Sequence, residues 1–167
     1  MNTDTNETEV TNKTEFYKII KEFVPDLLHT FPEYKETLHQ GIIDVLQDNV
    51  DTEDVTQLYD HCLSVYPERF FDILYQNKDI FADTSKELFF LPNIDFVKIW
   101  AEDISDKTRN VIWKYLQLIL FSVLSDVKHE KSFGDTAKLF EAINEEELKT
   151  KLEKTLEEMQ NIFEMGS

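Results

Sequence analysis

The sequence has few of the residues that interrupt or cross-link a chain. Its 167 residues include 3 Gly, 4 Pro and 1 Cys. A lone cysteine, Cys62, excludes an internal disulfide, so that packing must stabilise the fold. An all-β fold needs many Gly- and Pro-rich turns between short strands, and this chain lacks them. Because 41% of the residues are apolar, a folded helical protein is expected.

Positive charge is also scarce. The chain carries 17 Lys and Arg against 34 Asp and Glu, a formal net charge of −17, and its only arginines are Arg69 and Arg109. Direct binding of nucleic-acid phosphates over a broad surface is therefore disfavoured. The acidic balance suits solubility, which we favour, or attraction to a basic partner.

Sequence motifs for catalysis, cofactor binding or metal binding are missing as well. The only glycines are Gly41, Gly134 and Gly166, so that the sequence has no phosphate-binding or dinucleotide-binding loop. Cys62 falls on the apolar face of its predicted helix, where thiols are inert packing groups. The four histidines include no pair with the helical spacing of a zinc site; they are His29, His39, His61 and His129. We predict no catalytic residue, no cofactor and no metal, and an enzyme is the least favoured class.

No segment has the pattern of a targeting signal or a membrane span. The region after Met1 has no apolar stretch, and the most apolar run, residues 111–124, is short and interrupted by Lys114 and Gln117. We expect an intracellular protein, cytoplasmic or nuclear, that contacts no membrane.

The chain divides into three parts and a two-residue tail. Residues 1–12 lack aromatic and basic side chains, and we expect them to form a disordered leader. Residues 13–143 repeat apolar side chains at helical spacing and are predicted to form one helical domain. Residues 144–165 are predicted to form an amphipathic C-terminal helix. Residues 166–167, Gly-Ser, look like a cloning remnant, which suggests a truncated domain.

Local signals set the boundaries of the predicted helices. Pro25 is expected to break or kink the first helix, and Pro32 to begin a second one that runs to about Leu46. Gly41, inside that second helix, indicates close packing against a neighbour. Pro67 is expected to restart a helix, and N-caps are predicted at Thr52, Asp95 and Ser105.

The segment from about 105 to 127 is predicted to be the centre of the fold. Of the 14 residues from Val111 to Leu124, 11 are apolar. On a helical wheel the polar residues gather in one narrow strip formed by Lys107, Asn110, Lys114, Gln117, Ser125 and Lys128. A helix that is apolar in every other direction is surrounded by its neighbours. We therefore predict an all-α, single-domain bundle of about six to eight helices around this one.

Arg109 stands about 140° from that polar strip on the helical wheel. Its side chain either extends to water from the first turns of the helix or pairs with Asp95 or Asp103. We expect contact with a carboxylate of the segment 95–106. In both interpretations Arg109 has a structural role and not a functional one.

The C-terminal helix supplies the candidate partner-binding residues. Its apolar stripe consists of Leu148, Leu152, Leu156, Met159 and Phe163. Such a stripe, at the end of the chain and after a polar loop, can bind a protein partner. The alternative is that it packs on its own domain.

The block from 91 to 121 carries a family resemblance through the segments LPNIDF (91–96), DIS (103–105), TR (108–109) and IWKYLQLILF (112–121). With these segments the chain resembles an uncharacterised protein of large double-stranded DNA viruses of algae and amoebae, over about residues 16–163. The members of that family continue beyond the last residue of this chain. The resemblance implies a viral protein inside a host cell, and no activity or cofactor.

Three functions are compatible with the sequence. We favour a non-enzymatic interaction or scaffold domain with a protein partner. An acidic decoy or chaperone for basic nucleic-acid-binding proteins would need its negative charge on one face. An enzyme would need a pocket with convergent titratable groups.

Overall fold

A computed structural model describes residues 3–127 and five residues near the C-terminus, Thr150, Glu153, Lys154, Glu157 and Glu158. Side chains are described from residue 13 to residue 123 and at those five positions. The elements are α1 (Thr3–Thr30), η1 (Pro32–Thr37), α2 (Gln40–Leu46), α3 (Glu53–Glu68), α4 (Phe70–Leu74), η2 (Lys78–Phe81), α5 (Phe96–Ala101) and α6 (Asp106–Val127). Within residues 3–127 no strand forms, and the one β-bridge joins Leu91 to Ile94. The predicted all-α fold is confirmed.

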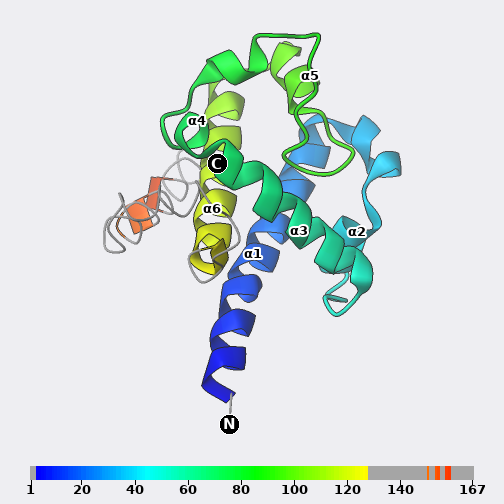
Figure 1. The fold of residues 1–167 in the computed structure, drawn as a ribbon. Helices are drawn as coiled ribbons and strands as arrows, with labels where there is room; N and C mark the ends of the chain where they lie inside the picture. Colours follow the sequence, from blue (N-terminus) through cyan, green and yellow to red (C-terminus); the bar gives the residue numbers. More distant parts are fainter. Residues whose placement is uncertain (1–2, 128–149, 151–152, 155–156, 159–167) are drawn as a thin grey trace.

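Helix α6 is the centre of this fold, as its apolar circumference predicted. It contacts α1, α3 and α4, and Figure 1 shows α1 and α6 running side by side. Every residue from Tyr115 to Val123 is buried. Large apolar side chains from several elements meet there, among them Phe23 of α1, which stacks on Tyr115 with ring centroids 4.6 Å apart.

Helix α1 is longer than the sequence suggested. It begins at Thr3, within the segment expected to be a disordered leader, and Figure 1 shows its first turns extending past the other helices. The helix also runs through Pro25 to Thr30, so Pro25 does not end it. Buried neighbours on both sides, including Val24 and Leu27, offset the cost of a proline inside a helix, which is roughly 3 kcal/mol.

The helix predicted from Pro32 to Leu46 is two elements. The 3-10 helix η1 begins at Pro32, and α2 begins only at Gln40. Between them the backbone of His39 is extended, and its Nδ1 accepts a 2.9 Å hydrogen bond from the N–H of Gly41. The histidine therefore acts as the N-cap of α2 and separates it from η1.

Gly41 confirms the predicted close packing. A Cβ atom at this position would lie 2.3 Å from the backbone oxygen of Asp54 in α3, a distance that atoms do not tolerate. Thr52 begins α3 as predicted, because its Oγ1 accepts a hydrogen bond from the N–H of Val55 at 3.2 Å. Pro67, in contrast, lies inside the last turn of α3, and the next helix starts at Phe70.

The segment between η2 and α5 is irregular, yet side chains fix its path. The buried carboxylate of Asp95 accepts hydrogen bonds from the N–H groups of Leu88 and Val97, each at 3.0 Å. The Tyr66 hydroxyl of α3 donates to the carbonyl of Phe90 at 2.9 Å. Asp95 thus caps α5 as predicted and also holds the preceding segment against the core.

Candidate functional site

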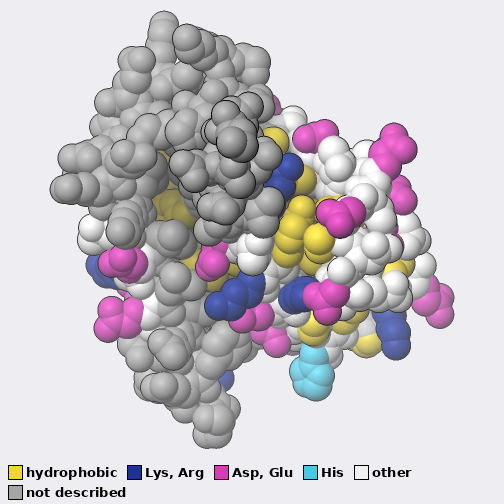
Figure 2. All heavy atoms as spheres, turned by 90° about the horizontal axis from the view of Figure 1, so that it is seen from below, with side chains coloured by type: hydrophobic (Ala, Val, Ile, Leu, Met, Phe, Trp, Pro, Cys, Tyr) yellow, Lys and Arg dark blue, Asp and Glu magenta, His cyan; other side chains and the backbone are white. Residues whose placement is uncertain are grey.

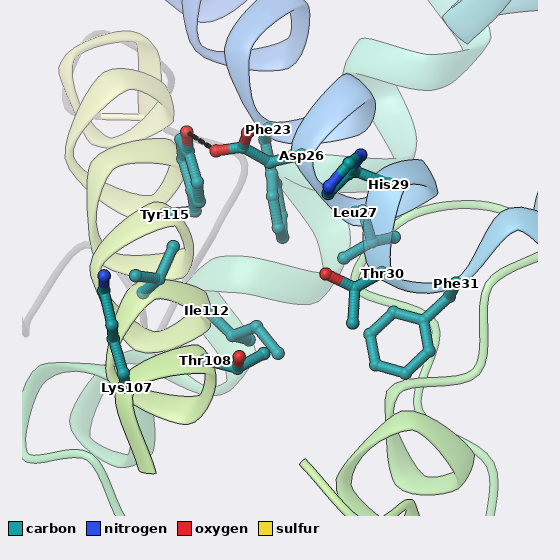
Figure 3. Close-up of a pocket in the computed structure, with 11 residues that line it drawn as sticks. Phe23, Asp26, Leu27, His29, Thr30, Phe31, Lys107, Thr108, Ile112 and Tyr115 are labelled. Carbon is teal, nitrogen blue, oxygen red and sulfur yellow. Dashed lines mark hydrogen bonds between the residues drawn. The ribbon is translucent and has the colours of Figure 1, made fainter. Parts of the chain in front are cut away.

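A cavity of about 390 Å³ opens between the C-terminal half of α1 and the N-terminal half of α6. Figure 3 shows side chains of both helices converging on it. Its walls are mainly apolar and are formed by Phe23, Leu27, Phe31, Val111 and Ile112. A cavity of this size and composition falls within the range of pockets that bind ligands or the side chains of a partner.

Asp26 and Tyr115 form the polar end of this cavity. The Tyr115 hydroxyl of α6 donates a 2.7 Å hydrogen bond to Oδ2 of Asp26 on α1, drawn as the dashed line in Figure 3. Burial raises the pKa of Tyr115, and the hydrogen bond to Asp26 and the negative charges of Asp26 and Glu22 raise it further. The phenol therefore stays protonated at neutral pH and holds the carboxylate in place.

The rim of the cavity is polar and carries both signs of charge. His29 and Thr30 come from the last turn of α1, and Lys107 and Thr108 come from the first turn of α6. The two helices therefore contribute different chemistry, because the carboxylate of Asp26 belongs to the α1 wall and the ammonium group of Lys107 to the α6 wall. Asp26 and the rim groups can together meet a cation and several hydrogen-bond acceptors.

Arg109 does not pair with Asp95 or Asp103, but it lies within ion-pair distance of Asp106, another carboxylate of the predicted segment 95–106. Its guanidinium Nη1 donates to the carbonyl of Ile104 at 3.0 Å, and the carboxylate beside it is that of Asp106, at 3.7 Å. That distance exceeds a hydrogen bond. The two predicted partners lie elsewhere: Asp95 caps α5, and Asp103 is exposed.

Carbonyl groups at the end of α5 explain this outcome. The other terminal nitrogen of Arg109 lies 3.4 Å from the carbonyl of Trp100 and 3.5 Å from that of Glu102. Its guanidinium carbon also lies 5.6 Å from the centre of the Trp100 ring. Carbonyl groups at a helix C-terminus attract a cation, so that the arginine completes the turn between α5 and α6.

The candidate partner-binding stripe, formed by Leu148, Leu152, Leu156, Met159 and Phe163, lies outside the described residues. Of the predicted C-terminal helix, five positions are described and all five are helical. One of them, Glu158, pairs with Lys114 of α6. This contact places one acidic residue of the C-terminal segment against the central helix.

Other sites considered from the sequence give no further candidate. Cys62 is fully buried in the core, and burial raises the pKa of its thiol, which keeps it protonated and unreactive. In the part of the chain that the structure describes, no three His, Cys, Asp or Glu side chains are grouped to hold a metal ion. None of the described helices has the length and hydropathy that crossing a bilayer requires.

Comparisons with protein-family models, with curated proteins and with solved structures gave no match.

Sequence reasoning missed this cavity. Asp26 and Tyr115 are 89 positions apart, and nothing in their local sequences connects them. One signal was present: Tyr115 lies in a helix that is otherwise apolar on that side, and a tyrosine hydroxyl in such a place needs a hydrogen-bond partner. The sequence could have indicated that a partner exists, but not which residue it is.

Proposed function

We propose that the chain is a non-enzymatic interaction domain that binds a protein partner through the cavity between α1 and α6. The observation that supports this proposal is the layout of the cavity, whose apolar walls are bordered by polar groups. Protein interfaces place their strongest contacts in the same way, with a large side chain in an apolar pocket and polar groups around it.

The chemistry of the cavity favours binding over catalysis. The high pKa of Tyr115 keeps its hydroxyl protonated, which makes the phenol a poor base or nucleophile. The Asp26 carboxylate is hydrogen-bonded to this phenol. Among the described residues that line the cavity, His29 forms no hydrogen bond with either group, so the cavity gives no support to a nucleophile paired with a base.

The decoy alternative has less support. Figure 2 shows Lys and Arg side chains between the Asp and Glu side chains on one face of the molecule, with hydrophobic patches among them. A decoy that attracts basic nucleic-acid-binding proteins would instead concentrate negative charge on one face. A viral origin and an intracellular location stay predictions from the sequence.

The proposal is tested by selecting peptides from a random library displayed on phage with the full chain as bait. Thr30, an exposed residue at the rim of the cavity, offers a position where a larger side chain blocks the entrance. We expect the selected peptides to bind the wild type and to lose binding to Thr30→Trp. The matched control is Gln57→Trp at an exposed position of α3, which should bind like the wild type.

Two outcomes would contradict the proposal. One is that no peptide is enriched. The other is that selected peptides bind Thr30→Trp as well as they bind Gln57→Trp. If binding instead disappears on deletion of residues 145–167 and is unaffected by Thr30→Trp, the partner binds the C-terminal stripe that the sequence offered as the candidate partner-binding surface.

A further inference from the structure

The cavity presents three kinds of group in one place. Its walls offer apolar contact through side chains such as Phe23 and Ile112, α1 offers the carboxylate of Asp26, and α6 offers the donors of Lys107 and Thr108. A ligand that satisfies all three must combine a large apolar group, a cation and hydrogen-bond acceptors.

The carboxylate of Asp26 is held ready for a cation. Tyr115 occupies its Oδ2, whereas its Oδ1 accepts no hydrogen bond from any described residue. The side chain is exposed, so that this second oxygen is accessible. Since Tyr115 fixes the carboxylate before any ligand arrives, little side-chain entropy is lost on binding.

The charge of the whole chain favours the same kind of ligand. A formal net charge of −17 attracts basic segments over long range and repels a second copy of the chain. It also disfavours an anionic amphiphile such as a fatty acid, whose head group would meet Asp26 as well as Lys107. The carbonyl groups of a peptide can accept hydrogen bonds from Lys107 and Thr108 without adding negative charge.

We infer that the occupant of the cavity is a peptide segment in which a large apolar side chain lies next to Lys or Arg. The apolar side chain fills the space between Phe23 and Ile112, the neighbouring cation pairs with Asp26, and backbone carbonyls of the peptide face Lys107 and Thr108. This inference rests on the proposed function and specifies the partner.

Three synthetic peptides test it: acetyl-Gly-Lys-Trp-Lys-Gly-amide, the same peptide with Glu in place of both lysines, and the Lys peptide with Ala in place of the aromatic residue. Binding is followed by NMR through the methyl groups of Val111 and Ile112, which line the cavity. We expect the Lys-Trp-Lys peptide to shift these signals at the lowest concentration. The Glu peptide should bind more weakly, and the Ala peptide should leave the signals unchanged.

The variant Asp26→Asn distinguishes the effect of the carboxylate in the cavity on peptide affinity from the effect of the net charge of the chain. Asparagine keeps an acceptor for Tyr115 and removes the negative charge. A partly exposed ion pair contributes up to about 1 kcal/mol, so that the affinity for the Lys-Trp-Lys peptide should fall by about threefold to fivefold. Asp51→Asn, at an exposed position between α2 and α3, changes the net charge equally and should have a clearly smaller effect.

The inference is wrong if the Glu and Lys peptides bind equally well, or if Asp26→Asn and Asp51→Asn weaken binding to the same extent. In either case the proposed function would still stand, provided that the peptides shift the Val111 and Ile112 signals and that Thr30→Trp abolishes those shifts. If no peptide shifts these signals and the phage selection also fails, the proposed function falls as well.

Discussion

The side-chain amide of Gln117, near the middle of α6, donates a 3.2 Å hydrogen bond to the backbone carbonyl of Leu74 at the end of α4. The same nitrogen lies 3.2 Å from the carbonyl of Ile73. Gln117 is buried, although the sequence placed it in the polar strip of the central helix. Part of that polar strip therefore makes contacts inside the protein. Gln117 donates to the last carbonyls of α4, and Lys114 pairs with Glu158.

Gln117→Glu should destabilise the fold, because a carboxylate would replace the donor and face two carbonyl oxygens. We expect a loss of about 2 to 3 kcal/mol in the free energy of unfolding at neutral pH, measured by urea denaturation. Part of this loss should be recovered at acid pH, where the carboxyl group is protonated and can donate. Gln57→Glu on the exposed face of α3 is the control, and equal losses in both variants would contradict the prediction.

Arg109→Ala should cost about 1 to 2 kcal/mol of stability, because the carbonyls at the turn between α5 and α6 lose a charged donor and the Trp100 ring loses its cation–π contact. Asp106→Asn removes the carboxylate at 3.7 Å, but Asp106 is fully exposed and should contribute little. Thermal unfolding of both variants measures the difference. A larger loss in Asp106→Asn would show that the ion pair, not the carbonyl contacts, stabilises this turn.

Stability should fall at alkaline pH. The pKa values of Tyr66 and Tyr115 are raised above their ordinary 10.0, chiefly by burial. Both groups stay protonated in the folded chain, whereas in the unfolded chain they ionise as the pH passes about 10. Their contribution is complete below that pH and is lost as the pH rises further, by up to about 1.4 kcal/mol per pH unit for each group.

Urea denaturation between pH 8 and 11 measures this effect. Tyr115→Phe should reduce the slope of stability against pH, because it removes a tyrosine whose pKa is raised by burial. Identical slopes in the wild type and in Tyr115→Phe would show that Tyr115 ionises as readily in the folded chain as in the unfolded one.

Gly41→Ala should destabilise the contact between α2 and α3. The added Cβ would meet the backbone oxygen of Asp54, which cannot move as a flexible side chain would. A cost of about 1 to 3 kcal/mol is expected for such overpacking, measured by thermal denaturation. Gln47→Ala at the exposed end of α2 serves as the comparison, and an unchanged midpoint in Gly41→Ala would refute the close approach.

Local signals made the outline of the fold predictable. The caps at Thr52, Asp95 and Ser105 depend on hydrogen bonds to residues two or three positions away, and the central position of α6 follows from its composition. The partners of Gln117 and Arg109 could not be predicted, because they are backbone carbonyls whose positions depend on how the chain turns. The contact between Asp26 and Tyr115 is non-local in the same sense.

The irregular segment between η2 and α5 should resist amide hydrogen exchange. The N–H group of Leu88 donates to Asp95, and that of Ile94 donates to the carbonyl of Leu91. The N–H of Phe96, at the start of α5, donates to the carbonyl of Leu88. Exchange requires these bonds to open, and the side chains around them are buried in the core. An exchange map of the protein should therefore mark this stretch as slowly exchanging although it has no regular secondary structure, and its opening should coincide with that of α3, whose Tyr66 holds Phe90 in place.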